Sequence, residues 1–334
     1  MVNNLLSNEL YIVSGSTHIK LAESIVEGMG LKLGALERRI HPNGELYVRY
    51  KDSVRGKHAI IIQPNHCTSD MTIQDSIWET ALLADAAKSA SASEITVIAP
   101  YLGYSRQDRK AKGREPIGTR VVLKQLENIG VNRIVTVDLH SPQSQAIFNG
   151  PFDHITAHPV LRRAMIETLK NTDNELWRIV APDAGAAKMA NRHGKEMGVN
   201  VMHMVKSRDP KDSNNIIRDQ DFPEAKGKIC ILYDDMIDTA GTLVSAAEAL
   251  KKSGAKSVYV AATHGIFSDP ASERLALNHI DKIIVTDSVP TDKISKKLGN
   301  KLEIVSIAPI IGATLHEILT DGSVSNLFDD ENHQ

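Results

Sequence analysis

Two adjacent carboxylates, followed by a run of hydroxyl and small residues, stand after one apolar segment of the chain. The segment is Ile229–Tyr233, and the run comprises Asp234, Asp235, Asp238, Thr239, Ala240, Gly241 and Thr242. Ligands of open α/β sheets bind at the carboxyl ends of strands, where a tight loop before a helix directs backbone N–H groups at an anion. The carboxylates would repel a phosphate but can accept hydrogen bonds from the vicinal hydroxyls of a sugar. The pattern indicates a ribose 5-phosphate site; the alternative is that Asp238 only caps the following helix.

A basic segment follows another predicted strand in the first half of the chain. Five basic residues fall between positions 106 and 114, directly after Tyr101–Ser105. Arginine presents a planar fork to phosphate oxygens, and glutamine can pair with a base or a ribose. Arg106 and Gln107 are therefore candidates for binding a nucleotide. The alternatives are a solvated basic loop and a weak nucleic-acid patch.

The motifs of both halves together resemble those of the ribose-phosphate diphosphokinases, the PRPP synthetases that make 5-phosphoribosyl 1-diphosphate (PRPP). The resemblance rests on Tyr-x-Gly-Tyr-x-Arg-Gln-Asp-Arg-Lys at 101–110, Arg-Glu-Pro-Ile at 114–117 and Asp-Leu-His at 138–140. It extends from about Tyr11 to Phe328. The segment 234–242 alone, Asp-Asp-x-x-Asp-Thr-Ala-Gly-Thr, also resembles the PRPP-binding motif of type I phosphoribosyltransferases.

The resemblance implies a role for each matching residue. The implied ATP contacts are His41, Asn43, Glu45, Arg106 and Gln107. His140 and Asp183 would hold a Mg²⁺ ion, which prefers few protein ligands together with substrate oxygens. Lys206 and Arg208 match the start of the family's flexible catalytic loop and would stabilise charge in the transition state. The chain departs from the family pattern at His41, where an aromatic residue is usual, and at 184–187.

The activity that the resemblance implies is transfer of the β,γ-diphosphate of ATP to O1 of ribose 5-phosphate, with AMP as the other product. Such a reaction needs alignment and charge neutralisation more than covalent catalysis. The sequence contains neither a Walker loop nor a Gly-x-Gly-x-x-Gly motif. Two alternatives are a phosphoribosyltransferase that consumes PRPP and a catalytically silent, PRPP-synthetase-like regulatory subunit.

These motifs need strands and helices to position them, and short β-rich runs alternate along the chain with segments of helical period. The predicted strands are Leu10–Ser14, Ala59–Gln63, Ile95–Ala99, Ile134–Asp138, Arg178–Ala181, Ile229–Tyr233, Val258–Thr263 and Lys282–Thr286. The predicted helices are Lys20–Gly28, Thr72–Ser89, Thr119–Ile129, Pro159–Leu169, Ala184–Met197 and Thr242–Lys252.

The sequence repeats itself in three places, in the same order in each half. Residues 55–60 resemble 226–231, 93–99 resemble 256–262, and 132–138 resemble 281–287. We therefore expect an α/β fold of two similar type I phosphoribosyltransferase-like domains, each a mainly parallel sheet flanked by helices. The expected domains are 1–155, the ATP side, completed by 314–330, and 156–313, the ribose 5-phosphate side.

Composition excludes several other classes of protein. The 334 residues carry a formal net charge of −2, which argues against a dedicated nucleic-acid binder. No apolar run approaches the ~20 residues of a membrane helix, and the N-terminus lacks the pattern of a signal peptide. The two cysteines, Cys67 and Cys230, lack metal-finger spacing, and we expect two buried, reduced thiols in a reducing compartment. We expect a cytoplasmic homo-oligomer that takes ATP and ribose 5-phosphate, at least a dimer and, as the resemblance implies, a hexamer.

Overall fold

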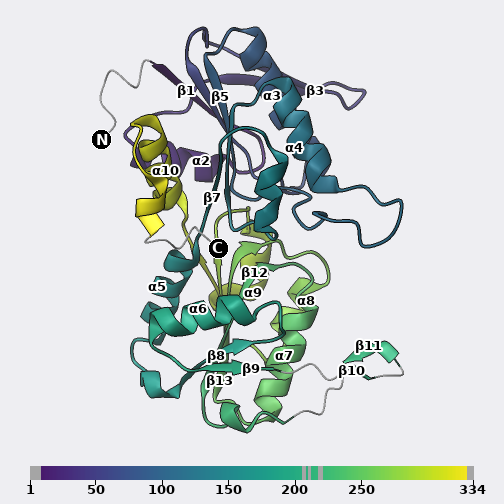
Figure 1. Cartoon of the computed structure of the whole chain (residues 1–334), viewed down its shortest axis with the longest axis vertical. Coiled ribbons are helices and arrows are strands. Elements are labelled where there is room, and N and C mark those ends of the chain that lie inside the picture. Colours follow the sequence, from purple (N-terminus) through teal and green to yellow (C-terminus); the bar gives the residue numbers. More distant parts are fainter. Residues whose placement is uncertain (1–8, 205–207, 210–211, 217–220, 329–334) are drawn as a thin grey trace. The chain divides into compact units, whose positions relative to one another are not determined.

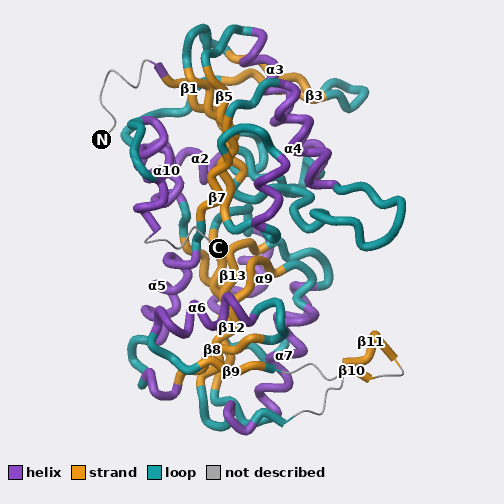
Figure 2. The backbone as a smooth tube through the Cα atoms, viewed as in Figure 1, coloured by secondary structure: helices purple, strands orange, loops and turns teal. Residues whose placement is uncertain are grey.

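The chain folds into two compact units, which a computed structural model describes over residues 9–204, 208–209, 212–216 and 221–328 (Figures 1 and 2). Unit 1 comprises Met1–Ala157, Ser288–Pro290 and Ser306–Gln334, and unit 2 comprises His158–Asp287 and Thr291–Val305. The assignment of one unit to ATP and the other to ribose 5-phosphate stays a prediction. In the described residues no helix is long and apolar enough to cross a membrane.

Unit 1 is built on a five-stranded sheet in the order β1-β4-β5-β6-β7, with every pair parallel. Its strands are β1 Leu10–Ser14, β4 His58–Ile62, β5 Glu94–Ala99, β6 Arg133–Val137 and β7 Phe152–Ile155. Most of their residues are buried. Strands covered on both faces read as nearly continuous apolar runs, and the sequence shows such runs here.

Helices cover both faces of this sheet. Leu10 and Ile12 of β1 lie in one apolar cluster with α2 (Ile19–Gly28) and α10 (Ala308–Leu319). Tyr11 and Val13, which point to the opposite face, lie in a second cluster with α3 (Ile73–Ser89) and α4 (Gly118–Ile129). Helices α2 and α10 lie side by side, although the rest of the fold separates them in sequence (Figure 1).

An antiparallel hairpin lies apart from the main sheet of unit 1. It pairs β2 (Leu36–Ile40) with β3 (Leu46–Tyr50) and contacts α3. The sequence does not predict these strands, because Leu36–Ile40 contains three charged residues and has no continuous apolar face. A short helical turn, η1, spans Pro142–Ile147, and another, η5, spans Val324–Phe328.

Unit 2 repeats this plan with one additional strand. Its sheet has the order β15-β14-β13-β12-β8-β9, and every pair is parallel. The strands are β8 Trp177–Ala181, β9 Val201–His203, β12 Ile229–Ile237, β13 Ser257–Gly265, β14 Lys282–Thr286 and β15 Leu302–Val305. Read from β8, the order matches that of unit 1, and the three repeated sequence segments fall on β4 and β12, β5 and β13, and β6 and β14.

The helices of unit 2 again cover both faces. One cluster joins the sheet to α5 (His158–Leu169) and α6 (Ala187–Met197). The other joins it to α7 (Gly241–Lys252), α8 (Ala271–Ala276) and α9 (Asp292–Leu298). The remaining elements are the two-stranded ribbon of β10 (Arg208–Asp209) and β11 (Asp212–Ile216) and the short turns η2 (Asn174–Leu176), η3 (Pro223–Ala225) and η4 (Gly299–Lys301).

The predicted α/β fold of two parallel-sheet units is confirmed. The strands Leu10–Ser14 and Lys282–Thr286 have the predicted ends, and every other predicted strand and helix is present with shifted ends. Two shifts affect the candidate site. Helix α6 begins at Ala187 and not at Ala184, and β12 continues to Ile237, beyond Asp234 and Asp235. The prediction that both cysteines are buried is wrong for Cys67, which is exposed.

His193 has no hydrogen bond for either ring nitrogen within the described residues, although it is fully buried in unit 2. Its ring is stacked on Tyr233, with centroids 3.6 Å apart and an angle of 6° between the planes. Burial, with the nearby His158, Arg162 and Arg192, lowers the pKa of His193 well below its ordinary value. The imidazole is therefore neutral and occupies an apolar position.

Substitution His193→Phe is expected to stabilise the protein, because phenylalanine keeps the stack and buries no unpaired nitrogen. The gain should be about 1–2 kcal/mol at pH 7 in urea unfolding. It should grow below pH ~6.5, where the unfolded histidine binds a proton that the folded one does not. Substitution of the exposed His203 serves as a control for the loss of an imidazole, and a destabilised phenylalanine variant would contradict the prediction.

Candidate functional site

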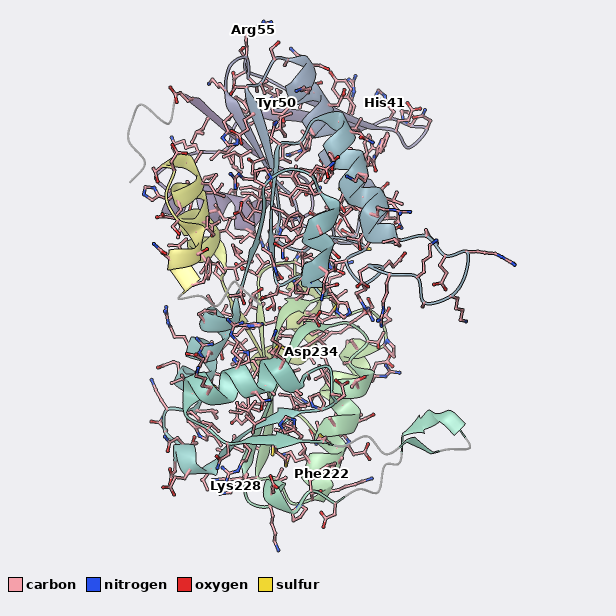
Figure 3. All side chains as sticks on the ribbon, viewed as in Figure 1. His41, Tyr50, Arg55, Phe222, Lys228 and Asp234 are labelled. Carbon is pink, nitrogen blue, oxygen red and sulfur yellow. The ribbon has the colours of Figure 1, made fainter. Side chains whose placement is uncertain are left out.

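Asp234 and Asp235 lie at the carboxyl edge of the sheet of unit 2. The pairing of β12 with β8 ends at Leu232, whereas its pairing with β13 continues to Ile237. The two carboxylates therefore stand on β12 beyond the end of the neighbouring strand. Both are half-buried, and Figure 3 labels Asp234. The sequence predicts that the strand ends at Tyr233, whereas in the structure Asp234 and Asp235 still belong to it. They nevertheless lie at the carboxyl edge of the sheet, as predicted.

The carboxyl groups of Asp183, Asp234 and Asp235 lie close enough at this edge to shift the pKa of Asp234. Burial raises the pKa of Asp234 to about 8, and the carboxylates of Asp235 and Asp183 add to the shift. Oδ1 of Asp234 accepts a hydrogen bond from the N–H of Asp235, 2.9 Å away. A carboxyl group with such a pKa gains from a ligand that donates hydrogen bonds or brings positive charge. Sugar hydroxyls and a divalent cation both do so.

The loop that leads into α7 has the conformation of an anion-binding turn. Ala240 has φ 60° and ψ 7°, in the left-handed region, and takes the N-cap position of α7 without a side-chain cap. Thr239 and Thr242, on either side, are exposed. The N-cap position thus belongs to Ala240 and not to Asp238. The first N–H groups of a helix that lacks a side-chain cap are suited to hold a phosphate.

Asp183 shapes the turn after β8. Its Oδ1 accepts a hydrogen bond from the N–H of Ala186 at 3.1 Å, so that residues 184–186 form a turn and α6 starts after them. A Cβ on Gly185 would lie 3.2 Å from the same oxygen, which would be a tight contact. The prediction that this helix begins at Ala184 is wrong because Asp183 accepts the N–H of Ala186 and holds residues 184–186 in a turn.

In unit 1, Arg106 and Gln107 lie in the loop after β5, and both are exposed. Tyr104 organises this loop: its carbonyl accepts hydrogen bonds from the N–H of Gln107 at 2.8 Å and from Oγ1 of Thr119 at 2.6 Å. Its hydroxyl accepts a bond from Nε2 of Gln74 at 2.9 Å. The loop is thereby fixed to both flanking helices while the side chains of 106 and 107 stay accessible.

His140 follows the next strand, β6, and is exposed. Asp138, with φ 37°, turns the chain at the strand end, and its Oδ2 accepts a hydrogen bond from the N–H of Ala157 at 2.9 Å. The N–H of Leu139 donates to Nε2 of His154 at 2.8 Å. Because β5 and β6 are neighbours in the sheet, their following loops leave it at the same edge.

His41, Asn43 and Glu45 form the tip of the hairpin, between β2 and β3, and Figure 3 labels His41. The N–H of His41 donates to the carbonyl of Glu45 at 2.8 Å, and Gly44, with φ 91°, completes the turn. Oδ1 of Asn43 accepts a bond from the N–H of Glu45 at 3.3 Å. The His41 ring packs edge-on against Tyr47, with centroids 6.0 Å apart. Asn43 and Glu45 are exposed at this tip.

The structure brings together Asp183, Asp234 and Asp235, and it places Asp238–Thr242 directly after them. Lys206 lies outside the described residues. The backbone of Arg208 belongs to β10, but its side chain is not described. In the described part of the chain, no three His, Cys, Asp or Glu side chains form a group that could hold a metal ion.

A buried polar network in unit 1 is absent from the predictions. The carboxylate of Glu79, 2% exposed, accepts hydrogen bonds from the N–H of Ser16 at 2.8 Å, from its Oγ at 2.6 Å and from Nε2 of Gln63 at 2.6 Å. Nε of Arg38 lies 3.3 Å from it, and the guanidinium also donates to the carbonyl of Ser14. Arg38 belongs to β2, so this network fixes the base of the hairpin.

The fold and these loops define a class: α/β proteins of two similar parallel sheets, with polar loops at the strand ends. The family model of the N-terminal domain of ribose phosphate pyrophosphokinase matches residues 10–130, and that of the phosphoribosyl synthetase-associated domain matches 196–329. The ribose-phosphate pyrophosphokinase of Corynebacterium glutamicum is 40% identical over 323 residues, 96% of each chain.

Two further relatives agree. The ribose-phosphate pyrophosphokinase of Bifidobacterium longum is 40% identical over 322 residues, 96% of this chain and 92% of that one. The crystal structure of phosphoribosylpyrophosphate synthetase from Mycobacterium smegmatis matches with a TM-score of 0.84 and 37% identity, over 94% of this chain and 100% of that one. The chain belongs to the ribose-phosphate pyrophosphokinase family.

Proposed function

We propose that the protein is a ribose-phosphate diphosphokinase, which transfers the β,γ-diphosphate of ATP to O1 of ribose 5-phosphate and releases AMP. The observation that carries this proposal is the edge of unit 2, in a chain of this family. There, half-buried carboxylates precede a loop whose left-handed Ala240 opens a helix without a side-chain cap. Carboxylates suit the sugar hydroxyls, and the loop suits the 5-phosphate.

Each half of the chain then binds one substrate. Asp234 and Asp235 accept hydrogen bonds from the ribose hydroxyls, and residues 238–242 hold the 5-phosphate. On the ATP side, Arg106 contacts the phosphates and Gln107 the nucleoside. His41, Asn43 and Glu45 contact the adenine from the tip of the hairpin. The edge-on contact with Tyr47 leaves a face of the His41 ring for stacking on a base.

Two residues of the chain carry groups that can bind a magnesium ion. In unit 2, Asp183 would supply a carboxylate oxygen, and in unit 1, His140 would supply an imidazole nitrogen. Mg²⁺ commonly takes few protein ligands together with substrate phosphates and water. Burial is the main cause of the raised pKa of Asp234, with Asp235 and Asp183 adding to it, and a bound cation would favour the ionised carboxylates. The ion, when bound, neutralises phosphate charge.

In the reaction, O1 of ribose 5-phosphate attacks the β-phosphorus in line, loses its proton, and the bond from this phosphorus to the oxygen of AMP breaks. The chain's own residues align the two substrates and offset the developing charge. Lys206 and Arg208 are assigned to the triphosphate in the transition state. We place this reaction in the cytoplasm, in a homo-oligomer.

The matched domain models disfavour a phosphoribosyltransferase that consumes PRPP, because residues 10–130 match the N-terminal domain of the pyrophosphokinases. A silent regulatory subunit would bind the same ligands without turnover. Its support in the sequence is the departure from the family pattern at His41 and at 184–187. Measurement of AMP formation from ATP and ribose 5-phosphate by the purified protein separates the diphosphokinase from both alternatives.

The protein is expected to form AMP and PRPP from ATP and ribose 5-phosphate, with Mg²⁺ present, and chelation should abolish the reaction. Substitution Lys206→Ala should lower kcat about 100- to 1,000-fold, the usual cost of removing one transition-state donor, while the KM for ribose 5-phosphate changes less than about threefold. Lys252→Ala, which removes a surface lysine paired with Glu248, is the control. Equal turnover of Lys206→Ala would refute its role, and a wild-type protein without activity would refute the function.

A further inference from the structure

Arg274 contacts the back of the loop assigned to the 5-phosphate. It lies on α8, and its Nη1 donates a hydrogen bond of 2.9 Å to the carbonyl oxygen of Thr239. A Cβ placed on Gly241 would be 3.2 Å from the same nitrogen. The guanidinium therefore stands against the loop on both sides of Ala240.

The bond to Thr239 fixes the direction of the next N–H group. A trans peptide is planar, so the carbonyl of Thr239 and the N–H of Ala240 point in opposite directions. With the carbonyl held by Arg274, the N–H of Ala240 faces away from the guanidinium. A 5-phosphate bound by this N–H group would lie on the side of the loop opposite Arg274.

The loop needs such support. Ala240 has φ 60°, a left-handed conformation that costs a residue with a Cβ about 1 kcal/mol. Within the described residues, the loop has no side-chain cap at the start of α7. A hydrogen bond from a charged donor to the preceding carbonyl is therefore well placed to stabilise this conformation.

Arg274 is itself well anchored. Its neighbours on α8, Ala271 and Leu275, are fully buried in the apolar cluster of α7, α8 and α9. Its backbone N–H donates to the carbonyl of Pro270 at 3.2 Å. No carboxylate of the described residues forms an ion pair with it, so its charge acts on the loop without local neutralisation.

We infer that Arg274 is a positioning residue for ribose 5-phosphate: it holds the Thr239–Ala240 peptide so that the N–H of Ala240 and the start of α7 face the 5-phosphate. This inference rests on the proposed function. Arg274 stays behind the loop and does not contact the substrate. Its effect should therefore appear in the affinity for the phosphorylated sugar and not in that for ATP.

The test compares Arg274→Met, which keeps the length of the side chain but removes donor and charge, with Arg274→Lys, which keeps both. In the methionine variant the KM for ribose 5-phosphate should rise about 10- to 100-fold, the range for loss of a charged hydrogen bond. The KM for ATP and the unfolding temperature should be unchanged, and lysine should restore most of the affinity. Isothermal titration with ribose 5-phosphate alone should show the same loss.

Arg178→Met is the matched control, because Arg178 also donates through Nη1 to backbone carbonyls, those of Glu175 and Trp177, elsewhere in unit 2. Should the methionine variant not fold, Arg274→Gln carries the same comparison. An unchanged KM for ribose 5-phosphate, or an equal rise for both substrates, would overturn the role of Arg274. A wild-type protein that forms no AMP would instead overturn the proposed function, so the two failures are distinguishable.

Discussion

Substitution Asp234→Asn is expected to make the ligand-free protein more stable while it impairs catalysis. The raised pKa of Asp234, about 8, arises from burial beside Asp235 and Asp183. Asparagine keeps the oxygen that accepts the N–H of Asp235, but it carries no charge. The ligand-free protein should therefore gain on the order of 1–2 kcal/mol at neutral pH. The KM for ribose 5-phosphate should rise about 10- to 100-fold through the loss of a charged acceptor.

The stability gain of Asp234→Asn should depend on pH in a defined direction. The folded pKa lies near 8 and the unfolded pKa near 4. Between these two pKa values the wild-type protein takes up a proton when it folds. Its free energy of unfolding therefore falls as the pH rises from about 4 to about 8. The advantage of the asparagine variant should be largest near pH 8 and small near pH 5, as measured by urea unfolding. Asp85→Asn, at an exposed carboxylate of α3, is the control, and a gain independent of pH would contradict the electrostatic cause.

Substitution Glu79→Ala is expected to have the largest effect on stability. Its carboxylate is buried and receives hydrogen bonds from Ser16 and Gln63 and the charge of Arg38. Alanine would leave these donors, including a partly buried guanidinium, without their acceptor. Breaking a buried ion pair in this way costs about 3–5 kcal/mol. Chemical unfolding of the full chain measures this cost.

The double variant Glu79→Ala with Arg38→Met separates the ion pair from the rest of the network. It should recover part of the loss, because no buried charge is left unpaired, and the cycle gives the coupling energy. Glu23→Ala, at an exposed position of α2, is the control. A loss below about 1 kcal/mol for Glu79→Ala would show that water replaces the carboxylate.

The sequence predicts those parts of the fold that depend on local patterns. The core strands are continuous apolar runs, and the segment from Asp234 to Thr242 combines such a strand with residues of distinctive chemistry. The hairpin is different, because its residues are half-exposed and charged, so that pairing between β2 and β3 leaves no periodic signal. Helix α10 is apolar, but its packing on α2 is a contact between segments that are distant in the chain.

The residues that support the site could not be predicted for a related reason. Glu79 lies in an Ala-rich helix, and a glutamate at such a position is normally solvated. Only the fold brings Ser16, Gln63 and Arg38 to it. Arg274 donates to a backbone carbonyl, and every residue has one. The side chain at position 239 therefore gives no sign of this contact in the sequence. Chemistry-bearing residues are thus visible in the sequence, whereas the groups that hold them in place are not.

Helix α10 packs on α2, and the two helices belong to parts of unit 1 that precede and follow unit 2 in the sequence. During synthesis, the segments of unit 2 leave the ribosome before α10 does. Unit 2 can therefore complete its core first, while the apolar face of α2 stays uncovered until α10 is synthesised. A nascent chain stalled before residue 308 would present this uncovered face to chaperones, in contrast to the usual order in which the N-terminal part folds first.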